Sequence, residues 1–176
     1  RWNYNIGGGQ LMDWIGHHCD IAHWGLANPK FGCGPDDSVG PLELTGTADF
    51  PDQKEVWNTA TKFRVECKYP NDVEVVIAGG HGDIQGGTRW IGTDGWVQVN
   101  RGKFETSNKE WMAEMKQKDT DQTLAINLYK SPGHGQEFID SIKSRKRTLT
   151  PVEIAHRSQT PGHLGHIAAL TGRKIK

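Results

Sequence analysis

The sequence lacks an excess of charge of either sign, because 21 Lys and Arg residues balance 21 Asp and Glu residues. This balance excludes overall electrostatic attraction to nucleic acid or to an anionic membrane as the basis of function. The sequence also has no apolar run near the roughly 18 residues that a membrane-spanning helix needs, and no secretion-signal pattern at its start. We therefore expect a soluble protein, and its 176 residues fit a single domain.

Cysteine is scarce, with three widely spaced residues, Cys19, Cys33 and Cys67. An odd number of widely spaced cysteines favours reduced thiols over a disulfide framework. Because there is no CxxC pair and only three thiols are present, a four-thiolate zinc site is excluded.

Cofactor-binding motifs are also missing. The glycines Gly7–Gly9 open a helix-like segment, but no strand precedes them and the third glycine of the dinucleotide fingerprint is absent. The glycine-rich stretch Ala78–Gly87 lies between two strand-like segments, so we expect an irregular hairpin there rather than a phosphate loop. The basic run Lys143–Arg147 ends a helical segment without interleaved aromatic residues, which favours a solvated helix end over a nucleic-acid contact.

The chain starts at Arg1 rather than Met, and a helix-like segment follows almost at once. We therefore expect that an N-terminal part of a longer parent protein is missing. Any export signal would lie on that part, and without such a signal we expect the parent to be cytoplasmic.

The periodicity of apolar residues divides the sequence into a helical, a strand-rich and a second helical region. Apolar residues at helical spacing predict a helix over 8–26, and a loop rich in Gly, Pro and Asp follows it. Short runs rich in Val, Ile, Thr and aromatic residues predict strands at 42–50, 61–69, 73–80 and, with a turn inside, 88–99. Helical patterns return at 108–118, 135–146 and 150–174.

The last helical segment carries its own start and stop signals. Thr150 is the expected N-cap and Pro151 the first helical residue, while Gly172 is the expected terminator. Pro161 predicts a kink, or a junction of two helices, near Thr160.

This order of elements predicts an α+β fold, with an open, mainly antiparallel β-sheet covered on one face by helices. Residues 1–176 form one domain in this prediction. Apolar and polar residues alternate in the segments 63–67 and 96–100, which predicts one buried and one more polar sheet face. The polar face is then free for a partner. Seven tryptophans are many for this length, and we expect most of them in the core or an interface, with one or two at a sugar site.

The predicted first helix carries a group of titratable side chains. On a helix, Asp13 and His17 lie one turn apart on the same face, with Asp20 one turn beyond. An aspartate in that position fixes the tautomer of the histidine and stabilises its cation, as general acid/base catalysis requires. An exposed ion pair or a capped core histidine is the commoner alternative. A metal site is the least favoured, because the histidines lack the spacing of an HExxH motif.

Three motifs together resemble the C-terminal domain of the Gfo/Idh/MocA family, which comprises glucose-fructose oxidoreductase, inositol dehydrogenase and their relatives. "GGGQLMDWIGHHCD" looks like the glycine-rich entry to the helix of that domain, with Asp13, His17 and Asp20 at the matching positions. "WIGTDGWVQV" is similar to the strand-turn-strand hairpin of the family, and "TPVEIAHRSQTPGHLGHIA" looks like the closing helices of one subgroup. These motifs span nearly the whole chain in the family's order.

The resemblance implies a parent of two domains, of which the N-terminal Rossmann domain that binds NAD or NADP is absent here. It implies hydride transfer at a carbinol carbon of a sugar or polyol, with His17 as proton acceptor or donor and Asp13 as its partner. Asp20 and Trp14 would contact the substrate, while the chain itself would hold no cofactor and no metal. The fragment would be inactive alone, because the hydride carrier has no site on it. Homo-oligomers would form through the open sheet face.

Three alternatives to a sugar or polyol oxidoreductase stay open. The chain could instead be a non-catalytic dimerisation or binding module, part of an NAD-dependent relative that cleaves glycosides, or a metal-dependent protein. The dimerisation module would expose apolar side chains on the outer sheet face, and the residues expected there are Val65, Cys67, Val75 and Ile77.

Overall fold

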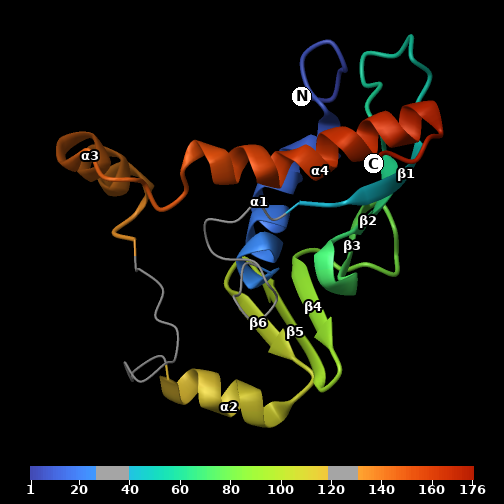
Figure 1. The fold of residues 1–176 in the computed structure, drawn as a ribbon. Coiled ribbons are helices and arrows are strands. Elements are labelled where there is room, and N and C mark those ends of the chain that lie inside the picture. The colour runs from blue at the N-terminus through green and yellow to red at the C-terminus, as the bar shows by residue number, and fades with distance from the viewer. Residues whose placement is uncertain (27–39, 119–130) are drawn as a thin grey trace. The chain divides into compact units, whose positions relative to one another are not determined.

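The computed structural model of the protein describes residues 1–26, 40–118 and 131–176. One helix opens this part of the chain, strands follow, and helices close it (Figure 1). The elements are α1 (Gly9–Leu26), β1 (Glu43–Asp49), β2 (Lys62–Lys68), β3 (Glu74–Gly79), β4 (Thr88–Gly92), β5 (Gly95–Asn100), β6 (Lys103–Thr106), α2 (Lys109–Lys118), α3 (His134–Ser144) and α4 (Val152–Thr171). No helix of the described ranges is long and apolar enough to cross a bilayer.

The α+β class and the antiparallel pairing are confirmed, but the strands form two three-stranded sheets rather than one. Their orders are β1-β2-β3 and β4-β5-β6, and β6 was not predicted. The stretch Ala78–Gly87 therefore connects strands of different sheets, and the expected hairpin is wrong. The loop predicted after α1, and Cys33 within it, lie outside the described residues.

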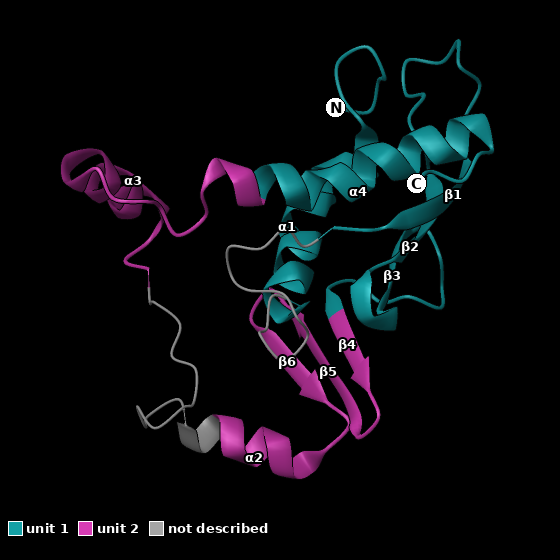
Figure 2. Ribbon diagram, in the orientation of Figure 1, with its two compact units in different colours: residues 1–88, 155–176 teal, residues 89–154 magenta. Residues whose placement is uncertain are grey.

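The chain divides into two compact units, residues 1–88 with 155–176 and residues 89–154 (Figure 2). The first unit contains α1, the first sheet and most of α4. The second contains most of the second sheet with α2 and α3. The expectation of one domain over residues 1–176 stays a prediction.

The first sheet has one buried and one open face, as predicted. In β2, Phe63, Val65 and Cys67 are buried, whereas Arg64 and Glu66 alternate with them on the open side. The strands β1, β2 and β3 are antiparallel neighbours, and left-handed residues in the turn at 70–72 close the second hairpin. The helices α1 and α4 both pack on the buried face, which confirms that helices cover one side.

The expectation that Val65, Cys67, Val75 and Ile77 lie on the outer face is wrong. Val65 and Cys67 are 1% exposed, and the two β3 residues pack against the buried clusters. The alternation along β2 was visible in the sequence, but it left open which set faces the helices. The apolar set faces them, because burying it removes apolar surface from water.

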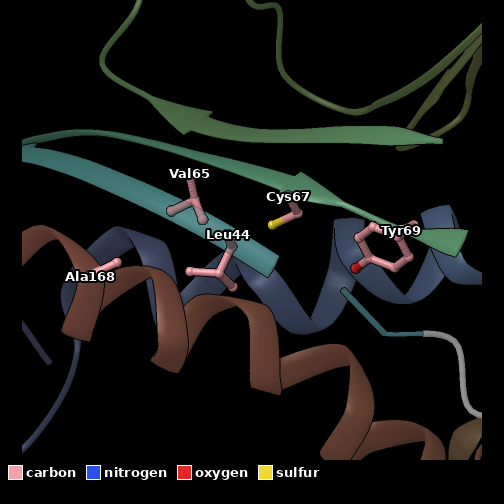
Figure 3. Close-up of a cluster of buried hydrophobic side chains, with 5 residues drawn as sticks. All are labelled: Leu44, Val65, Cys67, Tyr69 and Ala168. Atoms are coloured by element: carbon pink, nitrogen blue, oxygen red, sulfur yellow. The ribbon is translucent and has the colours of Figure 1, made fainter. Parts of the chain in front are cut away.

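Two apolar clusters fill the space between this sheet and its helices. Figure 3 shows the first cluster between the strands and α4, and it comprises Leu44, Val65, Cys67, Tyr69 and Ala168. The second joins α1 to the sheet and comprises Leu11, Ile15, Cys19, Ala60 and Phe63. Burying one aliphatic or aromatic side chain of this size contributes about 1.5–3 kcal/mol, so these clusters fix where α1 lies.

Close backbone approach between α4 and the sheet depends on glycine. A Cβ at Gly46 of β1 would collide with the carbonyl oxygen of Gly165, and one at Gly165 would collide with the Val65 side chain. Because neither residue has a Cβ, the α4 backbone lies directly on the strands.

One helix, α4, runs through Pro161, so of the two predicted alternatives the junction of two helices near Thr160 is wrong, and the kink stays a prediction. A proline inside a helix removes one backbone hydrogen bond. Its ring is fully buried here, and the apolar contact offsets that loss. The predicted terminator is confirmed, because α4 ends at Thr171 and Gly172 adopts a φ of 64°.

In the second unit, polar and aromatic groups meet on the sheet. Arg89 donates from Nε to Gln98 Oε1 at 2.7 Å, and its guanidinium lies 4.3 Å from the ring centre of Trp96. The helix α3 has no buried residue. Most of the basic run Lys143–Arg147 follows α3 and is exposed, in agreement with the predicted solvated helix end.

Candidate functional site

The helix α1 has a buried and an outer side. Its buried residues recur every four positions and pack on the sheet; they are Leu11, Ile15, Cys19 and His23. The opposite side is exposed, and we call it the outer face of α1: Asp13, Trp14, His17, Ile21 and Trp24. The sequence thus placed three of the four predicted site residues on one exposed surface.

Asp13 is held by Arg1 rather than by His17. The Nη1 atom of Arg1 donates to Asp13 Oδ2 at 2.7 Å, and the two side chains are 64% and 31% exposed. Such a surface pair contributes little to stability, about 0–1 kcal/mol. The Oδ1 atom of Asp13 is left to accept from another group, and His17 is one turn further along the same face.

Trp14 contacts two histidine rings. The His17 ring lies edge-on to the indole, with 5.6 Å between ring centres, and the His18 ring stacks on it at 5.4 Å with 8° between the planes. These contacts orient the indole beside His17, the candidate proton-transfer residue. An aromatic surface next to an imidazole suits a ligand with an apolar ring face and hydroxyl groups.

Asp20 lies apart from the other three site residues. The Ser158 hydroxyl donates to Asp20 Oδ1 at 3.1 Å, which ties α1 to α4. Burial raises the pKa of the Asp20 carboxyl, and the Ser158 hydrogen bond partly opposes this shift. The carboxyl thus faces the packing between helices, while its role towards a substrate stays a prediction.

His23 belongs to a buried polar cluster beneath α1. Its Nε2 atom lies 2.9 Å from the Tyr69 hydroxyl and 3.5 Å from Cys19 Sγ. Burial lowers the pKa of His23 to about 4. The pKa of Cys19 is raised to about 12, with burial as the largest cause. The imidazole is therefore neutral and the thiol protonated at pH 7, so the cluster fastens α1 to Tyr69, the residue after β2, and has no nucleophile.

The outer face of α1 is open rather than enclosed. A groove of about 390 Å³ lies on the first sheet between Glu43, Arg64, Lys68 and Glu74, away from the residues of the outer face of α1. Within the described ranges, no three His, Cys, Asp or Glu side chains are arranged to hold a metal ion. Acid/base chemistry at the outer face therefore needs a second surface that closes over it.

Two hydrogen-bond partners of the site residues were not predicted from the sequence. Arg1 is 12 residues from Asp13, and Ser158 is 138 residues from Asp20. Helical periodicity relates residues three or four apart, so no local signal pointed to either contact.

Comparison with known proteins gives a likeness of fold. No family model matches the sequence, and no curated protein matches it. The chain is similar to a solved protein from Listeria innocua described as NAD-binding, with 15% identity and a TM-score of 0.58 over 96% of this chain and 48% of that one. It is similar to an oxidoreductase from Thermotoga maritima, with 14% identity and a TM-score of 0.56 over 89% of this chain and 43% of that one.

A third similar structure is an oxidoreductase from Bacteroides fragilis, with 12% identity and a TM-score of 0.53 over 99% of this chain and 55% of that one. The chain thus spans about half the length of the solved structures that it matches. The matches are of the Gfo/Idh/MocA type, so the resemblance expected from the sequence is confirmed at the level of fold.

Proposed function

We propose that this chain is the substrate-binding and oligomerisation domain of an NAD(P)-dependent oxidoreductase that acts on a sugar or polyol. The observation that carries the proposal is the outer face of α1, where Asp13, Trp14 and His17 are exposed together. The fold supports it, because similar folds form about half of proteins described as oxidoreductases or as NAD-binding. Buried, protonated thiols at Cys19 and Cys67 fit the reducing conditions of the cytoplasm.

The glycine-rich start of α1 does not fit a dinucleotide. The Gly9 amide donates to the Arg1 carbonyl at 2.9 Å, and the Thr59 side chain occupies the space beside the Gly9 Cα. The glycine-rich start of α1 is therefore closed and is no cradle for a pyrophosphate. In this proposal the other half of the parent binds the dinucleotide, which supplies the hydride chemistry when bound.

His17 is the proposed proton acceptor for the hydroxyl of the reacting carbinol carbon in oxidation, and the donor in reduction. Its ring is exposed and has the Trp14 indole beside it. Asp13 would accept a hydrogen bond from the ring through Oδ1, while Arg1 keeps Oδ2. A carboxylate in that position stabilises the imidazolium that proton uptake creates.

Trp14 and Asp20 are proposed as substrate-binding residues. The indole of Trp14 is 38% exposed, and its contacts with two imidazoles hold its orientation. A sugar or polyol presents C–H groups that suit such a surface. Asp20 would reach substrate only by giving up its hydrogen bond from Ser158.

Oligomers are proposed to form through the open face of the first sheet. That face carries both signs of charge in paired positions, with Arg64 bound to Glu66 and to Asp83 at 3.0 Å. A two-fold partner would set cationic positions of one copy against anionic positions of the other. A non-catalytic dimerisation module is the second candidate function. This function would require the open face of the first sheet but not the residues of the outer face of α1.

Substitutions at the outer face of α1 test the proposal, in the protein that joins this chain to its dinucleotide-binding half. His17→Ala and Asp13→Asn are each expected to lower turnover of the parent's substrate by about 100-fold or more, as loss of an acid/base group does. His156→Ala is the matched control, because His156 is an exposed histidine of α4. Near-normal turnover in both α1 variants would remove the two residues from the mechanism and favour the module.

A further inference from the structure

Trp57 is exposed far more than the other exposed tryptophans of this chain. All seven tryptophans lie in the described ranges and none of them is buried, so they do not form the core, and the expected place of most of them in an interface stays a prediction. Trp57 is 74% exposed, compared with 38% for Trp14 and 37% for Trp24. A tryptophan left in water forgoes a large gain in apolar burial, so this indole has apolar surface that a ligand or partner can cover.

The loop between β1 and β2, which carries Trp57, is fastened in place by the next residue. The backbone N–H of Asn58 donates to the backbone carbonyl of Trp2 at 3.0 Å. The side-chain oxygen Oδ1 of Asn58 accepts from the backbone N–H of Tyr4 at 2.9 Å. Within the loop, Gln53 Nε2 donates to the Asn58 carbonyl at 3.1 Å, and Asn58 Nδ2 donates to the Gln53 carbonyl at 3.2 Å. The indole is therefore presented by a fixed backbone, which lowers the entropy cost of binding.

The same N-terminal segment connects this loop to the candidate site. Arg1 binds the Asp13 carboxylate through its side chain, and the adjacent residue Trp2 binds Asn58 through its carbonyl. Figure 1 shows the N-terminal segment and the β1–β2 loop at the same end of the first unit, where α1 begins. One N-terminal segment thus contacts both Asp13 at the start of α1 and the loop that carries Trp57.

The exposed apolar area here fits a small ring better than a protein surface. Besides Trp57, only Val56 and Ile6 are highly exposed apolar side chains of these two segments. A standard protein interface covers about 800 Å² on each partner, which is more than three side chains provide. The same two segments also carry amide and charged side chains, which suit the hydroxyls of a sugar; they are Asn3, Asn5, Asp52, Lys54 and Glu55.

We propose that Trp57 is a stacking platform for a second ring of the substrate, so that the substrate class is a glycoside or oligosaccharide rather than a free monosaccharide. This inference rests on the proposed function, because the first ring is the one that reacts at His17. Stacking of the second ring on the indole would add affinity without touching the reacting carbon.

The indole N–H signals of the ¹⁵N-labelled chain test this inference, with each signal assigned by a Trp→Phe variant. Maltose, cellobiose and lactose are the two-ring probes, and glucose and galactose are the one-ring probes. A two-ring probe is expected to shift both the Trp14 and the Trp57 signals. Trp57→Ala should weaken its binding about 5-fold while leaving the one-ring probes unaffected. Trp111→Ala is the control, because Trp111 lies in α2, outside the outer face of α1 and the β1–β2 loop, and it should change the binding of neither class of probe.

The outcomes separate this inference from the function on which it rests. If sugars shift Trp14 but no two-ring probe shifts Trp57, the platform is overturned and the sugar site at α1 stands. If no probe shifts either signal, the sugar substrate class and the platform both fall. If the Trp57 signal instead changes with protein concentration in the absence of sugar, the patch is a contact between copies of the chain, and the inference is overturned.

Discussion

At the scale of single residues, the buried His23 makes the stability of the protein depend on pH. The ring is 5% exposed and shares a hydrogen-bonded cluster with Tyr69 and Cys19. Burial lowers its pKa from 6.5 to about 4, so between these values the unfolded chain binds a proton that the folded chain does not. Stability therefore rises with pH across this window and is complete above it.

Lowering the pH from 7 to 4.5 is expected to remove about 2–3 kcal/mol of stability through His23 alone. Urea unfolding at both pH values measures the difference. His23→Gln should flatten this dependence, because glutamine has no charged form, while the exposed control His156→Gln should leave it unchanged. An equal pH dependence in the wild type and in His23→Gln would contradict the assignment.

The pairing of Asp13 with His17 shows where residue-level reasoning from the sequence succeeds and where it stops. Helical spacing placed both residues on one face, and the structure has them there. It did not show that Arg1 would hold the carboxylate or that Ser158 would bind Asp20. Those contacts depend on the tertiary fold, which residue spacing within one helix does not describe.

At the scale of elements, the approach of α4 to the first sheet depends on two glycines without side chains. Gly46→Ala is expected to lower the free energy of unfolding by about 2–4 kcal/mol, because its Cβ would meet the Gly165 backbone, which cannot move aside alone. Chemical denaturation measures this cost.

Gly135→Ala is the matched control for that substitution. A Cβ at Gly135 in α3 meets nothing within 4 Å, and alanine favours a helix over glycine by about 1 kcal/mol. This variant should be as stable as the wild type or more stable. If Gly46→Ala were equally stable, the close contact between α4 and β1 would be wrong.

Most elements could be predicted from the sequence, because their periodicity and turn residues are local. Three features could not. β6 has four residues, too few for a periodic signal, and Pro161 is tolerated because its ring is buried in a packed helix. The division into two sheets depends on which strands pair, and pairing between distant strands leaves no trace in local periodicity.

At the scale of the whole molecule, the open face of the first sheet is the proposed interface between copies. Val76 of β3 is 40% exposed on that face and is opposite Glu66 in the register. Val76→Lys should leave the fold intact, because the new ammonium lies beside a carboxylate. It should weaken self-association about 10-fold or more by placing a charge inside the contact.

Sedimentation equilibrium measures that association. Leu170→Lys on α4 is the control, because Leu170 is also exposed but lies on another surface. A wild-type chain that stays monomeric at its highest soluble concentration would contradict the proposed interface. So would a Val76→Lys variant that associates as tightly as the wild type.

The central claim is that this chain supplies the substrate half of an oxidoreductase and holds no dinucleotide itself. Titration with NADH and with NADPH tests it most directly, with tryptophan quenching and energy transfer to the nicotinamide as readouts. The closed glycine segment at Gly7–Gly9 predicts no saturable binding up to millimolar dinucleotide. Saturable binding in the micromolar range would show that the chain has a dinucleotide site of its own and would contradict the division of roles between two halves.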